Sequence, residues 1–176
     1  DNQDGPLPFE EYTLPERLQD AGYVTGMVGK WHLDLQAVPG QRRQQLLPEH
    51  LPPGHGFEEY FCGAMSRYQA SHDLAGNPLP NPPAEVNETG FRVDVQTEAA
   101  LSFLERREDD DRPFFLYLAY FAPHAPMQDP PDYMERMSHV KEYERRMALA
   151  SILAMDDGGG RIREKLTEMG VAENTL

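Results

Sequence analysis

The pattern of polar and apolar positions first predicts a short helix followed by a strand. Residues 13–16, Thr-Leu-Pro-Glu, have the form of a capping box, in which threonine caps the helix and glutamate reaches back, and proline is tolerated in a first helical turn. Gly22 suits the left-handed residue that ends a helix. The nearly uncharged run 23–29 then predicts a strand, which would deliver Lys30 and His32 to the loop after it.

Two further apolar patterns predict a second helix and a second strand. Over 92–107, apolar residues recur every four positions, which indicates one buried helical face. The run 114–121, FFLYLAYF, is apolar on both faces, as is typical of a strand buried between layers of helix rather than at a solvated edge. Pro123 ends this strand, so His124 also follows a strand directly.

The last part of the chain carries a third helical pattern, over 139–169. Three consecutive glycines at 158–160 interrupt it, and because an interior glycine costs about 1 kcal/mol relative to alanine, we expect a break or bend there. Helix, strand, helix, strand, helix is the order of a protein built on a sheet with helices against it. The predicted fold class is therefore α/β.

A proline-rich excursion, over 35–90, separates the first strand from the second helix. Segments such as LPEHLPPGHG and GNPLPNPPAE predict irregular backbone, whose order comes from contacts rather than from repeating structure. Phe57, Tyr60 and Phe61 favour partial order within it. With 176 residues the chain is long enough to build a core, and we expect residues 1–176 to belong to one domain.

Composition and charge exclude some kinds of partner. The chain has 16 basic and 30 acidic side chains and a net charge of −14, which argues against non-specific binding to nucleic acids. No apolar run approaches the roughly 20 residues that cross a bilayer, so no membrane span is predicted. Cys62 is the one cysteine, so an internal disulfide is impossible.

The polar residues after the two predicted strands suggest one shared ligand site. In open α/β sheets, ligands bind beyond the carboxyl ends of the strands, where we expect Lys30, His32 and His124. Lysine offers a point charge to a phosphate or sulfate oxygen, and an imidazole can transfer a proton as a bond to oxygen breaks. The cluster thus suits an anionic ester. The alternative is that each is an ordinary polar residue at the end of a strand.

Four stretches of the sequence resemble motifs of the sulfatase family. GYVTGMVGKWHLD, at 22–34, matches the family's Gly-Tyr-x-Thr-x-x-x-Gly-Lys-Trp-His-Leu-Gly signature at every fixed position except the last, where Asp34 replaces glycine. GHGFEEYF at 54–61 is similar to the family's Gly-Phe-Asp-x-Phe segment, and RPFFLYLAYFAPHAP at 112–126 to its Pro-Phe-Phe-Leu-Tyr strand with the Ala-Pro-His turn. Residues 155–176 resemble its helix ending in Gly-x-x-x-Asn-Thr-Leu. The resemblance covers nearly the whole chain, in the family's order.

This resemblance implies an alkaline-phosphatase-like mixed sheet sandwiched by helices, incomplete in this chain. It also implies hydrolysis of small-molecule or carbohydrate sulfate esters by a formylglycine made from cysteine or serine, in a periplasmic, secreted or lysosomal protein. Lys30 would hold a sulfate oxygen and the hydrated aldehyde. His32 would hydrogen-bond that hydrate and help to expel sulfate, and His124 would contact sulfate and assist the leaving oxygen.

Parts of the family's site are missing from this chain. The Cys/Ser-x-Pro/Ala-x-Arg nucleophile motif and two calcium-binding aspartates lie before the matched region in the family, and an Asp-Asn-Gly motif and a further lysine lie after it. We therefore expect a central fragment that has no metal ligand and is inactive alone, with calcium and formylglycine in the full-length protein. CGAMSR at Cys62 echoes the nucleophile motif, but its arginine stands one position too late, so a partly buried thiol is the preferred interpretation.

For the other aspartates and histidines that could bind a metal or a substrate, the sequence favours structural roles. Asp156 and Asp157 would point about 100° apart on a helix, so they predict a solvated face rather than a metal site. His50, His55 and His72 lack the spacing of a metal site and predict surface or local hydrogen-bonding roles, with His72 a weak candidate for substrate contact.

Two other functions stay open at this point. One is hydrolysis of phosphate or phosphonate esters by a member of the same superfamily, which rates on matched sulfate and phosphate esters would separate. The other is a truncated, non-catalytic module that binds anions, which a sulfate titration would test. The leaving group does not follow from the sequence.

Overall fold

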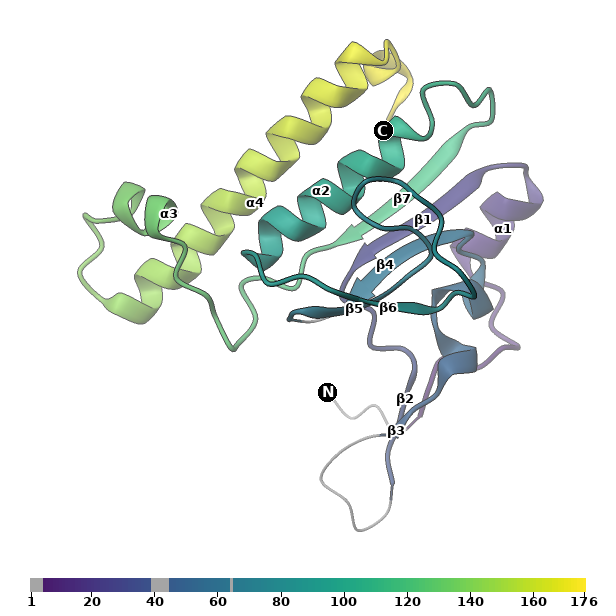
Figure 1. Cartoon of the computed structure of the whole chain (residues 1–176), viewed down its shortest axis with the longest axis horizontal. Coiled ribbons are helices and arrows are strands. Elements are labelled where there is room, and N and C mark those ends of the chain that lie inside the picture. Colours follow the sequence, from purple (N-terminus) through teal and green to yellow (C-terminus); the bar gives the residue numbers. More distant parts are fainter. Residues whose placement is uncertain (1–4, 39–44, 64) are drawn as a thin grey trace.

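A five-stranded mixed sheet forms the centre of the molecule (Figure 1). The computed structural model describes residues 5–38, 45–63 and 65–176. The order across the sheet is β6-β5-β4-β1-β7, with β1 parallel to both β4 and β7, and with β5 and β6 antiparallel. This arrangement confirms the predicted α/β class. The strands are β1 (Val24–Gly29), β4 (Glu59–Gly63), β5 (Arg67–Ala70), β6 (Ala84–Asn87) and β7 (Phe114–Ala119).

Helices cover the sheet, and two of them, α2 and α4, run side by side over one face (Figure 1). The predicted capping box is present at the start of α1, where Thr13 and Glu16 bond each other's backbone N–H groups. No helix in the described ranges is long and apolar enough to cross a bilayer. The α-helices are α1 (Leu14–Asp20), α2 (Arg92–Glu105), α3 (Pro131–Arg136) and α4 (Tyr143–Glu168); the short elements are η1 (Pro48–His50), η2 (Pro52–His55), η3 (Ala172–Asn174) and the hairpin β2 (Leu35–Gln36) with β3 (Gln45–Leu46).

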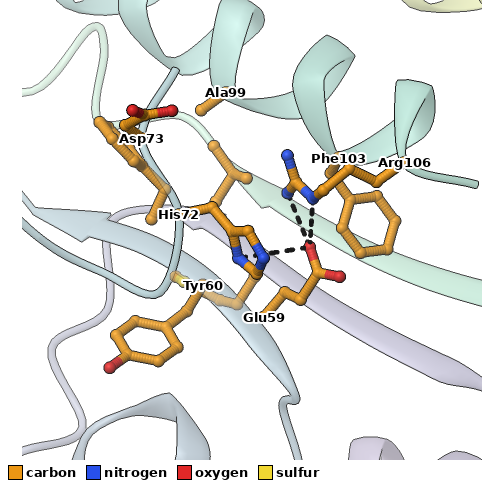
Figure 2. A pocket seen from close by; sticks show the side chains of 10 residues that line it. Glu59, Tyr60, His72, Asp73, Ala99, Phe103 and Arg106 are labelled. Carbon is orange, nitrogen blue, oxygen red and sulfur yellow. Dashed lines mark hydrogen bonds and ion pairs between the residues drawn. The ribbon is translucent and has the colours of Figure 1, made fainter. Parts of the chain in front are cut away.

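Ion pairs fasten the carboxyl end of α2 to the amino end of β4 (Figure 2). Glu59 Oε2 accepts from Arg106 at 2.6 Å, and Glu59 Oε1 accepts from Arg107 at 2.9 Å. His72 Nδ1 lies 3.8 Å from the same carboxylate. We call Glu59, Arg106, Arg107 and His72 the Glu59 cluster. The cavity beside it has a volume of about 10 Å³, so the cluster is closed.

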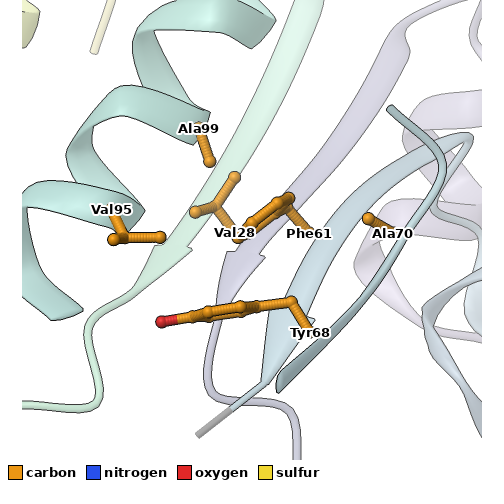
Figure 3. Close-up of a cluster of buried hydrophobic side chains, with 6 residues drawn as sticks. All are labelled: Val28, Phe61, Tyr68, Ala70, Val95 and Ala99. Carbon is orange, nitrogen blue, oxygen red and sulfur yellow. The ribbon is translucent and has the colours of Figure 1, made fainter. Parts of the chain in front are cut away.

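Alternate residues of the strands build a core on each face of the sheet. Toward α2, Val28, Phe61 and Tyr68 pack against Val95 and Ala99 of that helix (Figure 3). The opposite face buries a second cluster under η1 and η2, made of Met27, Leu51, Phe57, Tyr60 and Cys62. Each large apolar side chain buried in this way contributes about 1.5–3 kcal/mol, so both faces of the sheet hold the strands in place.

The predicted irregular backbone of the excursion at 35–90 is wrong in part. This range contains three strands of the main sheet, β4, β5 and β6, besides the small hairpin. They are four or five residues long and stand between proline-rich and glycine-rich turns. A strand of this length shows little periodicity of its own, and the sheet partners that stabilise it are distant along the chain.

The predicted break at 158–160 is also wrong, because α4 is continuous from Tyr143 to Glu168. Gly158 faces α2 and the residue that follows β7, and a Cβ atom at this position would lie 2.6 Å from both Thr97 Oγ1 and the Tyr120 hydroxyl. A glycine is therefore needed where the two helices come together. Packing along the rest of the helix outweighs the low helix propensity of the three glycines.

The expectation that the strand at 114–121 is buried between layers needs correction as well. In the described residues, β7 pairs only with β1 and forms an edge of the sheet. None of its six residues is fully buried, and Tyr117 is 47% exposed. Its position at the edge leaves both faces of β7 partly exposed, and on the face away from α2 Phe57 stacks at 6.4 Å from Phe115 and 6.5 Å from Tyr117.

Candidate active site

A pocket of about 510 Å³ opens at the carboxyl edge of the sheet, where the parallel strands β1, β4 and β7 all end. Lys30, His32 and His124 all line it. The structure thus brings together the three residues that the sequence singled out, from two loops about 90 positions apart in the printed sequence. Their chemical roles remain predictions.

The backbone of β1 turns sharply to present Lys30 and His32. Gly29 has φ +107°, and a Cβ atom there would lie 2.0 Å from the Ala119 carbonyl oxygen. That oxygen accepts the Lys30 N–H at 2.7 Å, which ties the end of β1 to β7. His32 has φ +117°, a strained value for a residue with a side chain. Strained backbone of this kind persists where the surroundings enforce it, which is common at functional sites.

Trp31 anchors the same turn to the loop that follows. Its indole N–H donates to the His50 carbonyl oxygen at 2.8 Å, and its ring meets Phe57 edge-on at a centroid distance of 5.9 Å. The residue between Lys30 and His32 is therefore held by a hydrogen bond and by packing, which restricts where its two neighbours can lie.

His124 lies in a tight turn after β7. Its N–H donates to the Phe121 carbonyl oxygen at 3.0 Å, and its ring lies 4.9 Å from the Phe121 ring. His124 Nδ1 is 2.6 Å from the Ala125 carbonyl oxygen. Because a carbonyl oxygen can only accept, Nδ1 carries the proton and Nε2 is left for a ligand. Lys30 Nζ is 5.2 Å from the centroid of the Phe121 ring, so Phe121 connects the two loops.

Three further polar groups in the pocket were not predicted as site residues. Asp34 is 6% exposed, and burial raises the pKa of its carboxyl, opposed by its backbone hydrogen bond and by His32. Arg67 and Glu85, both exposed, stand on the neighbouring strands β5 and β6. The change from glycine to Asp34 within the signature was one available signal. Arg67 and Glu85 gave none, because their strands were not predicted.

Cys62 also lines the pocket, at the end of β4. It is 3% exposed, and burial, with a smaller contribution from Asp34, raises the pKa of its thiol to about 12. The thiol is thus protonated and shielded at neutral pH, which fits the interpretation of Cys62 as a structural residue rather than as the source of a nucleophile.

The described residues do not form a calcium site, since no three His, Cys, Asp or Glu side chains gather closely enough to hold an ion. Asp157 forms an ion pair with Arg136 across α3 and α4, and Asp156 is exposed.

The remaining histidines lie outside the pocket. His72 belongs to the Glu59 cluster at the opposite edge of the sheet, so its weak candidacy as a substrate contact is not supported by its position (Figure 2). Burial and the Arg106 cation lower the pKa of His72. His50 and His55 are buried, not on the surface, and they stack on each other at a centroid distance of 5.6 Å. His50 Nδ1 lies 3.0 Å from the Leu7 carbonyl oxygen, in agreement with the predicted hydrogen-bonding role.

Solved structures share this fold. The chain aligns with the structure of Ps i-CgsB in complex with k-i-k-neocarrahexaose at a TM-score of 0.73 and 24% identity, over 96% of this chain and 39% of that one. It aligns with BT4656 in complex with D-glucosamine-2-N,6-O-disulfate at a TM-score of 0.70 and 16% identity, over 97% of this chain and 49% of that one. The alkaline-phosphatase-like fold is confirmed, and this chain contains part of it.

Sequence comparisons agree with the fold. The chain is 34% identical over 192 residues to the uncharacterized sulfatase YdeN of Escherichia coli, covering 100% of this chain and 33% of that protein. It is 30% identical over 187 residues to N-acetylgalactosamine-6-sulfatase of Canis lupus familiaris, covering 98% of this chain and 32% of the relative. The chain thus spans about a third of the length of these relatives. Because the sulfatase family model matches residues 1–176, the chain belongs to the sulfatase family.

Proposed function

We propose that the protein carrying this chain hydrolyses sulfate esters of carbohydrates, and that this chain supplies one wall of the active site. The observation that carries the proposal is the presence of Lys30, His32 and His124 in a single pocket at the carboxyl edge of the sheet. Family membership supports sulfate as the anion. The carbohydrate part rests on the relatives and neighbours, which include an N-acetylgalactosamine-6-sulfatase and a complex with a glucosamine disulfate.

Lys30 is proposed to bind a sulfate oxygen. Its ammonium group lies over the Phe121 ring and lines the pocket, and within the described residues it has no carboxylate at ion-pair distance. A fixed cation of this kind stabilises the negative charge that spreads over the sulfate oxygens as the ester bond lengthens. The pocket volume of about 510 Å³ exceeds what a sulfate group alone needs, which leaves room for part of the alcohol.

His124 is proposed to protonate the leaving oxygen. With Nδ1–H donated to Ala125, Nε2 of the imidazolium would transfer its proton to the alcohol oxygen as the S–O bond breaks. His32 lies in the same pocket and would donate a further hydrogen bond to the anion or to the group that attacks it. The nucleophile, expected by family resemblance to be formylglycine, does not come from the described residues. We therefore propose that this chain is inactive by itself.

The test is hydrolysis by the full-length protein and by its Lys30→Ala and His124→Ala variants. Lys30→Ala should lower kcat/KM for 4-nitrophenyl sulfate by about 100- to 1,000-fold, the usual cost of removing one donor to a developing anion. His124→Ala should impair a sugar sulfate more than 4-nitrophenyl sulfate, because an alcohol leaving group needs a proton and nitrophenolate does not.

Matched controls exist in the same chain. Lys141 and His139 are exposed and lie outside the pocket, so Lys141→Ala and His139→Ala should keep the parent rate. The proposal fails if Lys30→Ala retains parent activity while folded. It also fails if the full-length protein hydrolyses a matched phosphate ester faster than the sulfate ester, which would indicate a phosphoesterase. Sulfate binding without hydrolysis of any ester would instead indicate an anion-binding module.

A further inference from the structure

We propose that Arg92, on α2, is a positioning residue for His124. The inference rests on the proposed function, because it assumes that His124 acts on a substrate. Arg92 is 1% exposed and is the first residue of α2. No motif in the sequence singled it out, and its guanidinium lies among the residues of the turn after β7 rather than in the solvent.

The guanidinium of Arg92 holds the turn on both sides of His124. It donates to the carbonyl oxygen of His124 at 3.5 Å and to that of Pro126, and its carbon lies 4.7 Å from the centroid of the Phe121 ring. The two carbonyl groups that it holds flank the Ala125 carbonyl, which is the group that accepts the proton of His124 Nδ1. Arg92 therefore fixes the peptide that sets the tautomer and the direction of the imidazole.

Two glutamines complete this arrangement. Gln128 Oε1 accepts from both the backbone N–H and Nε of Arg92, at 2.9 Å and 3.1 Å. Gln96, one helical turn after Arg92 and fully buried, accepts the Phe121 N–H at 3.2 Å. The buried polar face at the start of α2 is thus directed at the segment 121–128, which carries His124.

Stability alone does not account for an arginine at this position. In the described part of the chain, no carboxylate lies at ion-pair distance from Arg92, whereas Arg106 at the other end of α2 pairs with Glu59. A buried charge without a counterion is costly, and a cation at the amino end of a helix opposes the helix dipole. What Arg92 supplies is a planar set of donors, which bonds several acceptors at once, and a second positive charge against the Phe121 ring that Lys30 also contacts.

The experiment measures kcat and KM of the full-length protein with a sulfate ester for Arg92→Lys and Arg92→Met. Lysine keeps the charge but cannot hold several acceptors in one plane, so Arg92→Lys should lower kcat by about tenfold and leave KM within about twofold. Methionine removes both properties, so Arg92→Met should lower kcat by about 100-fold and raise KM. The controls are Arg106→Lys and Arg106→Met, which remove the arginine that follows the carboxyl end of α2, far from the turn, and should keep the parent kcat.

A second readout does not depend on activity. In protein labelled with 15N-histidine, the His124 ring should show the Nδ1–H tautomer in the parent and a mixture of tautomers in both Arg92 variants. Parent kcat together with an unchanged tautomer in folded Arg92→Met would overturn the proposal. If Arg92→Met does not fold, Arg92→Lys decides by the same two criteria. If the full-length protein hydrolyses no sulfate ester, the proposed function fails, and the tautomer alone then decides whether Arg92 positions His124.

Discussion

The two ends of α2 use the same kind of side chain in opposite ways. At its carboxyl end, Arg106 forms an ion pair with Glu59, and the cavity beside the Glu59 cluster has a volume of only about 10 Å³. At its amino end, Arg92 holds backbone carbonyl groups beside a pocket of about 510 Å³. One edge of the sheet thus neutralises its cations in ion pairs, whereas at the other edge Lys30 lines an open pocket beside the buried Arg92. This difference supports our proposal that an anion binds at the carboxyl edge.

The largest loss of stability should follow from Gly29→Ala, which alters the carboxyl edge of the sheet, beside the 510 Å³ pocket. The added Cβ would lie 2.0 Å from the Ala119 carbonyl oxygen, on a residue with φ +107°. Relieving this contact would separate β1 from β7, at a cost of about 3 kcal/mol or more in the free energy of unfolding. Urea denaturation measures the loss. Gly159→Ala is the matched control, because nothing lies within 4 Å of its Cβ, and it should stabilise α4 by up to about 1 kcal/mol. Equal stabilities of the two variants would contradict the role of Gly29.

A smaller loss of stability should follow from Glu59→Gln, which alters the Glu59 cluster at the opposite edge of the sheet. The variant leaves Arg106 and Arg107 without their shared carboxylate, in a site where the Glu59 side chain is 13% exposed. Because the group is nearly buried, we expect a loss of about 2–3 kcal/mol in the free energy of unfolding, seen as a lower midpoint in denaturant. The kcat of the full-length protein for a sulfate ester should not change. A fall in kcat with unchanged stability would show that the two edges are not independent.

The smallest effect should follow from Asp34→Asn, which removes a negative charge from the pocket. Burial raises the pKa of Asp34, so the folded chain keeps this proton at pH values where the unfolded chain has lost it. Asp34 therefore contributes less to the stability of the folded chain as the pH rises above about 3.9, the ordinary pKa of an aspartate side chain. Asp34→Asn should be more stable than the parent at pH 7 but not at pH 3, and should bind sulfate about threefold more tightly at pH 7. Calorimetric titration with sulfate measures the affinity, and weaker binding by the variant would contradict this account.

The sequence predicted the strands and helices whose own pattern is strong. The capping box of α1, the strand before Lys30 and the helix at 92–107 all appear within a few residues of their predicted positions. The sequence pattern did not predict β4, β5 and β6, because strands this short are stabilised by neighbours distant along the chain. It also failed at 158–160, where the close approach of Gly158 to Thr97 and Tyr120 decides the local structure.

The candidate site also contains residues that the sequence predicted and residues that it did not. The meeting of Lys30 and His32 with His124 follows from strand ends at one edge of a parallel pair, which the sequence indicated. Arg92 and Gln96 were not predicted, because a polar residue on an amphipathic helix usually faces water. Only the tertiary structure shows that these two side chains are buried against the turn that carries His124.

The position of Trp31 makes it a fluorescent probe of the pocket. It is the only tryptophan of the 176 residues, and it lies in the wall of the pocket between Lys30 and His32. The tryptophan fluorescence of this chain therefore comes from one indole, whose N–H donates to the His50 carbonyl oxygen. Displacement of solvent from the cavity changes the surroundings of that chromophore, so occupancy could be followed by its emission without any dye or label.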